Sequence, residues 1–267
     1  MKKRRLIPVI LVKNGWVVQS RNFKTFQKIG NPTISVKRCS EWGSDELILL
    51  DISREEFYNN RQDINFKNNK SFLEILNEIS KFCFMPLVAG GKIKTLKKIE
   101  NFLVNGADKI SINTEATLNS KFIKQASQEF GSQCIVVSID VKKIRGDYKI
   151  FTDNGSQLVN INLKDFLKKI QDFGAGEVLI NSIDRDGSGK GFDIDLINEV
   201  EDVIEIPQVC CGGAGSYDHF IEVANKSRVD AIAAANFFQY IDQSVFLTKK
   251  KLCENNLNFR NADLIEI

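Results

Sequence analysis

Two glycine-rich turns occupy corresponding places in the sequence and have the composition of anion sites. The first, Gly90-Gly91, ends the stretch FMPLVAGG, and the second, Gly212-Gly213, ends IPQVCCGG. Glycine lets backbone N–H groups approach a ligand, and a helix that begins after such a turn adds the positive end of its dipole. In each half a further strand ends in small residues, Asn113-Thr114 and Ala235-Asn236. We therefore expect two phosphate sites, suited to a substrate with a phosphate at each end.

The cysteines beside the second glycine turn raise the alternative of a metal or redox site. None of the six cysteines forms a CxxC pair, and His219 is the only histidine. A zinc site would need several such ligands at characteristic spacing. Cys210 and Cys211 end an apolar run, where free cysteine behaves as a small hydrophobe. We predict reduced structural cysteines, with no bound metal and no cofactor.

Composition limits the partners of the chain. It has 267 residues and a net charge of +3, from 37 basic and 34 acidic side chains. Such a small excess does not suggest nucleic-acid binding. The apolar run at 6–12 is short and lacks a small-residue cleavage site, so it is not expected to be a signal peptide. No segment approaches the roughly 20 apolar residues that span a membrane, and we expect a cytoplasmic protein without a membrane partner.

Short apolar runs alternate with segments of helical period along the whole chain. The eight runs are at 6–12, 46–52, 84–90, 109–113, 134–140, 177–184, 206–211 and 230–235. Their near-continuous apolarity is typical of strands buried on both faces of a parallel sheet. The helical segments include 71–82, 95–106 and 163–174. Eight strand–helix units predict a (β/α)8 TIM barrel, and a doubly wound open sheet is the alternative.

An internal repeat supports the barrel. Residues 86–114 and 207–236 each contain a proline, an apolar strand, a glycine turn, a helix, and an aspartate before another strand. The repeat indicates two similar half-barrels within a single domain over 1–267. We expect insertions at 53–70, a polar loop, and at 141–160, where YKIFTD predicts a small hairpin. Both follow strands, on the face where barrel active sites lie.

Five motifs carry a specific family resemblance. They are DELILLDI (45–52), GADKISINT (106–114), FGSQCIVVSID (130–140), GAGEVLINSIDRDG (174–187) and GGAG (212–215). Over nearly its full length the chain resembles the HisF family, the cyclase subunits of imidazole glycerol phosphate synthase. The resemblance implies an enzyme that accepts ammonia from a HisH-like glutaminase subunit. It also implies that the ammonia is used on a bis-phosphorylated ribulosyl substrate.

The resemblance also implies roles for individual residues. It assigns one phosphate to Asn113 and Thr114, beside Gly91. It assigns the other to five residues of the second half: Asp186, Gly187, Gly213, Ala235 and Asn236. Four charges at the opposite strand ends match a gate for ammonia: Arg5, Glu46, Lys109 and Glu177. Four solvated strand-end charges are the alternative, since exposed pairs contribute little. Asp108 matches a residue that faces the glutaminase.

The sequence departs from the family pattern at the face of the barrel that would bind the substrate. The family uses two aspartates as general acid and base, and Asp140 matches one of them. Leu11 stands in the place of the other. Leucine cannot exchange a proton, and the loss of a catalytic acid or base costs orders of magnitude in rate. Further departures cluster nearby, at Gln19, Lys92, Cys211 and Asn236. Lys92 either supplies a charged donor to the ligand or points to solvent.

These departures resemble the HisF-like proteins of surface-glycan clusters, the WbuZ type. The resemblance implies that the chain delivers ammonia for a sugar-directed amidotransferase, which converts an N-acetyl group to an acetamidino group. The acceptor would be a phosphorylated small molecule or a sugar nucleotide. The alternatives are the cyclase of histidine biosynthesis and a non-catalytic scaffold that activates the glutaminase. Asp51 and Asp184 are secondary site candidates, and His219 is expected on a helix surface.

Overall fold

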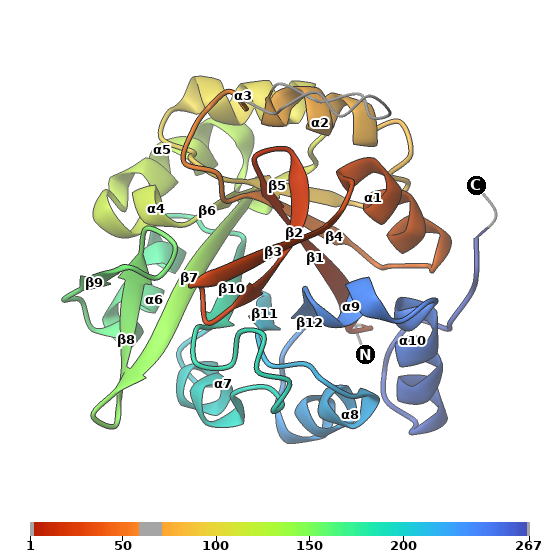
Figure 1. Cartoon of the computed structure of the whole chain (residues 1–267). Helices are drawn as coiled ribbons and strands as arrows, with labels where there is room; N and C mark the ends of the chain where they lie inside the picture. The colour runs from red at the N-terminus through yellow and green to blue at the C-terminus, as the bar shows by residue number, and fades with distance from the viewer. Residues whose placement is uncertain (1–2, 59–70, 266–267) are drawn as a thin grey trace.

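Parallel strands close into a barrel in the computed structural model, which describes residues 3–58 and 71–265 (Figure 1). In order round the barrel they are β1 (Arg5–Lys13), β4 (Leu47–Asp51), β5 (Leu87–Gly90), β6 (Lys109–Ile112), β7 (Ile135–Ile144), β10 (Glu177–Ser182), β11 (Gln208–Cys211) and β12 (Ala231–Ala234). Pairing of β7 with β10 and of β12 with β1 leaves no free edge in this circle. The predicted (β/α)8 barrel is confirmed, because an open doubly wound sheet would have two edges.

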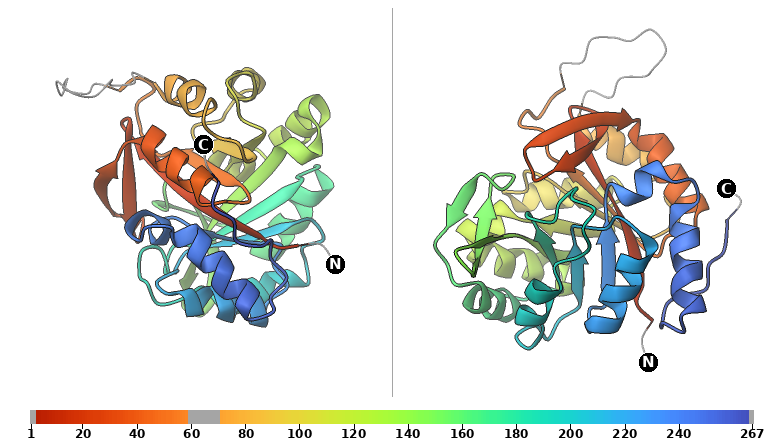
Figure 2. Two further views of the ribbon diagram at one scale, coloured as in Figure 1. Left: turned by 90° about the vertical axis from the view of Figure 1, so that its right-hand side faces the viewer. Right: turned by 60° about the horizontal axis from the view of Figure 1, so that its bottom comes forward.

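Helices follow the strands and cover the outside of the barrel (Figure 2). They are α1 (Pro32–Glu41), α2 (Phe72–Ile79), α3 (Leu96–Val104), α4 (Thr114–Leu118), α5 (Lys121–Phe130), α6 (Leu163–Asp172), α7 (Ile194–Glu201), α8 (Tyr217–Lys226), α9 (Phe237–Tyr240) and α10 (Ser244–Glu254), with a 3₁₀ turn over Ser132–Cys134. In α6 the residues spaced for one helix face are all buried: Leu163, Phe166, Leu167 and Ile170. This apolar face holds the helix on the barrel. Within the described ranges, no helix is long and apolar enough to cross a membrane.

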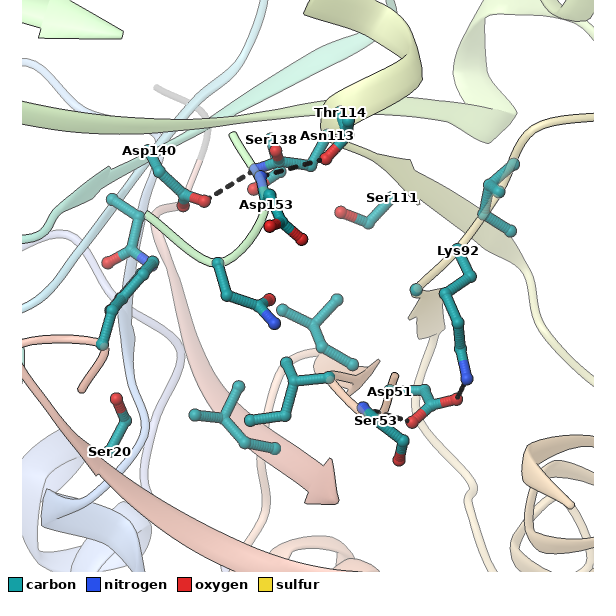
Figure 3. Close-up of a pocket in the computed structure, with 18 of the residues that line it drawn as sticks. Ser20, Asp51, Ser53, Lys92, Ser111, Asn113, Thr114, Ser138, Asp140 and Asp153 are labelled. Atoms are coloured by element: carbon teal, nitrogen blue, oxygen red, sulfur yellow. Dashed lines mark hydrogen bonds and ion pairs between the residues drawn. The ribbon is translucent and has the colours of Figure 1, made fainter. Parts of the chain in front are cut away.

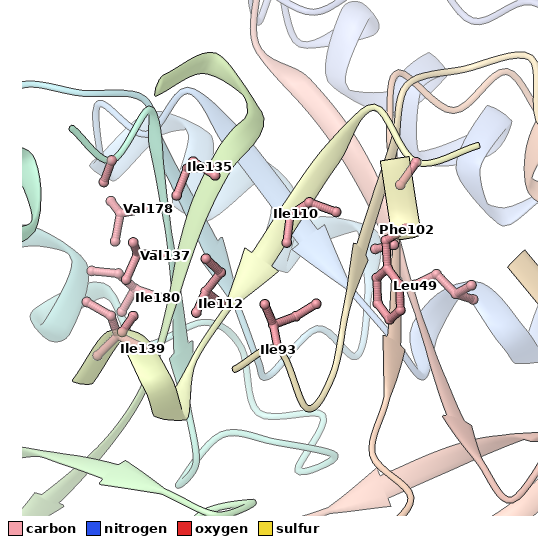
Figure 4. Close-up of a cluster of buried hydrophobic side chains, with 14 of the residues drawn as sticks. Leu49, Ile93, Phe102, Ile110, Ile112, Ile135, Val137, Ile139, Val178 and Ile180 are labelled. Carbon is pink, nitrogen blue, oxygen red and sulfur yellow. The ribbon is translucent and has the colours of Figure 1, made fainter. Parts of the chain in front are cut away.

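Alternation along β7 determines which side chains enter the barrel. Successive side chains of a strand point to opposite faces. The outward residues of β7 join the apolar layer beneath the helices (Figure 4): Ile135, Val137 and Ile139. Val136 belongs instead to the cluster inside the barrel, with Ile7 and Leu179. The same period directs Ser138 and Asp140 inward, toward the carboxyl end of the barrel.

Two hairpins extend barrel strands beyond the mouth. β1 turns at Asn14-Gly15 into β2 (Trp16–Arg21), which pairs with β3 (Thr25–Gly30). β7 pairs with β8 (Asp147–Thr152), and β8 pairs with β9 (Gln157–Val159). The hairpin expected within 141–160 is therefore present, and the β2–β3 hairpin adds to the predicted elements. Of the other expected insertion, residues 59–70 lie outside the described residues.

Candidate active site

A cavity of about 640 Å³ opens at the carboxyl ends of the barrel strands. Its wall takes residues from every barrel strand or the loop after it. This is the face of a (β/α)8 barrel on which active sites are built. Figure 3 shows Asp140 and Asn113 at one side of this cavity and Lys92 with Asp51 at another. We call it the acceptor cavity.

Asp140 is buried in the wall of this cavity, only 7% exposed. Asn113 Nδ2 donates a hydrogen bond to its Oδ2 at 3.0 Å, and the Asn181 side chain, in register on β10, donates another. Burial raises the pKa of Asp140 to about 7; the charge of Asp186 acts in the same direction and the two amides act against it. A carboxyl group that titrates near neutral pH can take up and release protons during a reaction.

The raised pKa of Asp140 predicts a pH-dependent cost to stability. This pKa is about 7 in the folded chain, against an ordinary value of 3.8. The protonated carboxyl contributes its full share to the free energy of unfolding below about pH 4, and this contribution is lost as the pH rises to about 7. The free energy of unfolding of Asp140→Asn, relative to the unmodified chain, should therefore increase over that range and then level off. Urea unfolding at several pH values measures this difference, and a constant difference would contradict the assignment.

The first glycine turn forms one end of the acceptor cavity. The lining residues here come from β5, β6 and the loops after them: Gly91, Lys92, Lys94, Asn113 and Thr114. Lys92 Nζ lies 2.8 Å from Asp51 Oδ2 and also donates to the Glu55 carbonyl. Lys92 is therefore directed at Asp51 in the cavity wall, and its role as a charged donor to the ligand stays a prediction.

The region of the second glycine turn is held by the β2–β3 hairpin. Asp186 Oδ2 accepts hydrogen bonds from Ser20 Oγ at 2.6 Å and from Phe23 N at 3.0 Å. Asn236 Nδ2 donates to the Ser20 carbonyl at 2.7 Å, and its Oδ1 accepts from Ser20 N at 3.3 Å. Asp186 and Ala235 line the acceptor cavity. Within the described part of the chain, its lining does not include three of the expected phosphate ligands: Gly187, Gly213 and Asn236.

Leu11 lines the acceptor cavity at the end of β1, on the side of the barrel opposite β7. Further apolar residues from the barrel interior line the cavity with it: Val9, Leu50 and Leu179. The inward position at which the resemblance implies a second aspartate therefore has no proton-exchanging group.

The four charged residues at the opposite strand ends meet in a closed ring of ion pairs, which we call the charge ring. The Arg5 guanidinium bonds Glu46 through one nitrogen and Glu177 through the other. Lys109 Nζ lies 2.8 Å from Glu46 Oε1 and 2.9 Å from Glu177 Oε2. Burial alone would raise the pKa of Glu177, but Arg5 and Lys109 lower it. Glu46 and Glu177 are buried, so the alternative of four solvated charges does not describe this structure.

The remaining sequence candidates lie away from the acceptor cavity. Asp108 is exposed at the amino end of β6, near the charge ring, and accepts a hydrogen bond from Leu87 N at 2.8 Å. Asp184 lines a separate cavity of about 380 Å³. His219 lies on α8, where its Nδ1 accepts from Gly215 N at 3.1 Å, so it supports the loop of the second glycine turn. Gln19 is buried and bonds Gln27 within the hairpin at 2.6 Å.

Several lining residues were not expected from the sequence. The polar side chains that also line the acceptor cavity include Ser20, Ser111, Ser138 and Asn181. Ser138 precedes Asp140 by two positions, and Ser111 precedes Asn113 by two. Because side chains two apart on a strand share a face, that spacing was the available signal for both serines.

The fold and the site define a class: a (β/α)8 barrel with an acid-containing cavity at its mouth and a charge ring at its base. A sequence model described as "Histidine biosynthesis protein" matches residues 5–242. The chain is 38% identical over 266 residues to the "Putative imidazole glycerol phosphate synthase subunit hisF2" of Vibrio vulnificus (strain YJ016), covering 100% of this chain and 94% of the relative.

Two further relatives carry the name "Imidazole glycerol phosphate synthase subunit HisF". The protein of Bacillus cereus (strain G9842) is 36% identical over 261 residues, and that of Natranaerobius thermophilus is 37% identical over 260 residues. Each alignment covers 97% of this chain and 100% of the relative. The chain therefore belongs to the HisF family of histidine biosynthesis proteins.

Proposed function

We propose that the chain is the ammonia-receiving subunit of a glutamine-dependent synthase and that its acceptor is a surface-glycan sugar. In this proposal the N-acetyl group of the sugar becomes an acetamidino group, in the cytoplasm. One observation carries it: the charge ring is complete, whereas the mouth has Leu11 in place of an acid. Such an arrangement can still deliver ammonia to the mouth. It cannot carry out a reaction that needs two carboxyl groups as general acid and base.

The barrel interior supplies the path for ammonia. Between the charge ring and the acceptor cavity lies a cluster of small and branched apolar side chains, including Ile7, Ile48, Val88, Val136 and Ala233. A neutral ammonia molecule can cross such surroundings, whereas an ammonium ion would have to be desolvated at large cost. The charge ring acts as the gate to this path, and the path delivers the neutral nucleophile to the mouth.

A HisH-like glutaminase subunit is the proposed source of ammonia. It would bind the face around the charge ring, where Asp108 is exposed. Two large apolar side chains near the amino ends of β5 and β6 are also exposed, Phe84 by 71% and Val104 by 79%. Exposed apolar side chains grouped with polar ones mark protein interaction surfaces. Docking there would place the glutaminase next to the gate.

The acceptor cavity is the proposed site of nitrogen transfer. Asp140, with its pKa of about 7, can accept the proton that ammonia loses as it attacks the carbonyl carbon of the N-acetyl group. The new C–N bond replaces the bond to the amide oxygen, which leaves as water. The first glycine turn, with Asn113 and Thr114, would bind a phosphoryl group of a phosphorylated sugar or a sugar nucleotide. A sugar-directed amidotransferase would act as third partner and bind the rest of the acceptor.

Imidazole glycerol phosphate synthesis is the second candidate function. The names of the relatives from Bacillus cereus and Natranaerobius thermophilus favour it. In that reaction the chain would close an imidazole ring on a ribulosyl bis-phosphate, with Asp140 as its one retained acid. A non-catalytic scaffold for the glutaminase is a third possibility, and it predicts no dependence of nitrogen transfer on Asp140.

Isotope transfer distinguishes these functions. The chain and its glutaminase subunit would be supplied with glutamine labelled with ¹⁵N in the amide. One reaction contains the ribulosyl bis-phosphate substrate of the cyclase, and the other contains a UDP-N-acetylhexosamine with the amidotransferase. We expect mass spectrometry to find ¹⁵N in the sugar and none in an imidazole product. Robust formation of labelled imidazole glycerol phosphate would overturn the proposal.

A further inference from the structure

The barrel strands bring two kinds of side chain to the inner end of the acceptor cavity. The lining side chains that belong to the apolar interior cluster, or pack against it, come from β1, β4, β10, β11 and the end of β12: Val9, Leu11, Leu50, Leu179, Cys211 and Ala235. On β6 and β7 the inward positions hold serine hydroxyls instead, Ser111 and Ser138. These hydroxyls therefore lie on the side of the barrel that holds Asp140.

Ser138 stands between the barrel interior and Asp140. Side chains two positions apart on a strand share a face and lie about 7 Å apart. On β7 this face carries Val136 of the interior cluster, then Ser138, then Asp140. On β6 the corresponding face begins at Lys109 of the charge ring and continues to Ser111. A molecule that moves outward through the interior therefore reaches the two serines before Asp140; Figure 3 labels both serines with Asp140.

Both serine hydroxyls are buried and have no protein partner. Ser111 is 4% exposed and Ser138 is 5% exposed. Neither hydroxyl makes a hydrogen bond within the part of the chain that the structure describes. Ser20, another lining serine, differs from them because its Oγ donates to Asp186 at 2.6 Å. A buried hydroxyl without a protein partner is free to bind a small polar molecule.

Ammonia has the hydrogen-bonding groups that fit this pair of serines. Each hydroxyl offers one donor and two acceptor lone pairs. Ammonia offers three N–H donors and one lone pair, so it can donate to one hydroxyl and accept from the other. The apolar side chains across the barrel offer no competing hydrogen bonds, and they favour a neutral molecule over an ion.

We infer that Ser138, together with Ser111, binds ammonia as it leaves the barrel interior and holds it beside Asp140. The inference rests on the proposed function for the arrival of ammonia through the barrel, and it adds the residues that receive it. Ser138 exchanges no proton in this role. It orients ammonia so that an N–H group remains free to reach Asp140, the proposed base.

The dependence of the initial rate on ammonium concentration tests the inference, at fixed pH and without the glutaminase. The acceptor is the ribulosyl bis-phosphate or the UDP-N-acetylhexosamine with its amidotransferase, whichever the unmodified chain converts. Ser138→Ala should raise the KM for ammonium about threefold to tenfold, the effect of one lost hydrogen bond of ordinary strength, and leave the KM for the acceptor unchanged. Ser138→Thr retains the hydroxyl and should keep the KM for ammonium near that of the unmodified chain.

Ser244→Ala is the matched control. Ser244 is a buried serine on α10 whose Oγ also has no partner among the described residues, and it does not line the acceptor cavity. Its replacement should leave the ammonium dependence unchanged.

Three results would overturn the inference and leave the proposed function standing. They are an unchanged KM for ammonium in Ser138→Ala, an equal rise in the KM for the acceptor, and the same rise in Ser138→Ala and Ser138→Thr. Failure of the sugar reaction alone does not affect the test, because either acceptor serves. Use of ammonium with neither acceptor by the unmodified chain would overturn the inference and the proposed function together.

Discussion

Replacement of Asp140 by asparagine is expected to lower ¹⁵N transfer to the acceptor by about 10²- to 10⁴-fold, the usual effect of removing a general acid or base. Asparagine has nearly the same size and can still bond Asn113 and Asn181. It cannot exchange a proton. With Leu11 at the end of β1, Asp140 is the retained member of the implied pair of acids. The measurement is the initial rate of label incorporation, with whichever acceptor the unmodified chain converts.

The pH profile and a matched control separate catalysis from structure. If the Asp140 carboxylate is the base, the rate of the unmodified chain should rise with pH up to about 7, the pKa of this group, and then level off. Asp184→Asn is the control, because Asp184 is also an aspartate that follows a barrel strand, β10. It lines the separate cavity and accepts a hydrogen bond from Lys143 N at 2.7 Å. Equal rates for the Asp140→Asn variant and the unmodified chain would show that Asp140 is not catalytic, and would favour the scaffold.

The barrel and the position of Asp140 could be predicted because both follow from local patterns. Apolar runs of strand length, separated by helices of 3.6-residue period, leave few arrangements other than a parallel barrel or an open sheet. Alternation along 135–140 then directs Asp140 inward once β7 is a barrel strand. The charge ring could be predicted in the same way. Its four residues stand at the starts of strands, and the amino ends of these strands lie together at one end of the barrel.

The contacts that shape the acceptor cavity could not be predicted, because they join distant segments. Ser20 and Asn236 are 216 positions apart, yet they hold the hairpin at the mouth. Asn14-Gly15 was a readable signal for the turn from β1 into β2, which leads into that hairpin, since both residues adopt positive φ, as the favoured two-residue turn requires. The direction in which the hairpin lies, however, depends on hydrogen bonds to Asp186 and Asn236, which follow β10 and β12. Lys92 likewise needed Asp51, from the neighbouring strand, to fix its orientation.

Replacement of Lys109 by alanine is expected to uncouple glutamine hydrolysis from nitrogen transfer. Lys109 bonds both acids of the charge ring, so its loss leaves Glu46 and Glu177 with Arg5 alone. Breaking a buried ion pair costs about 3–5 kcal/mol of stability, and the cost here should be smaller because Arg5 remains. The opened ring would admit water and lose ammonia to solvent. We expect several-fold less ¹⁵N product per glutamine hydrolysed, measured as the ratio of labelled product to glutamate.

Supplied ammonium provides the internal comparison for Lys109→Ala. Ammonia from solution can reach the acceptor cavity through the open mouth, so the variant should retain its rate with ammonium salt while losing coupling with glutamine. Lys226→Ala is the matched control, since Lys226 pairs with Glu222 at 2.6 Å on the outer surface of α8. Thermal unfolding shows that each variant is folded. An unchanged product-to-glutamate ratio in folded Lys109→Ala would mean that ammonia does not pass through the charge ring, and the proposed path would have to be abandoned.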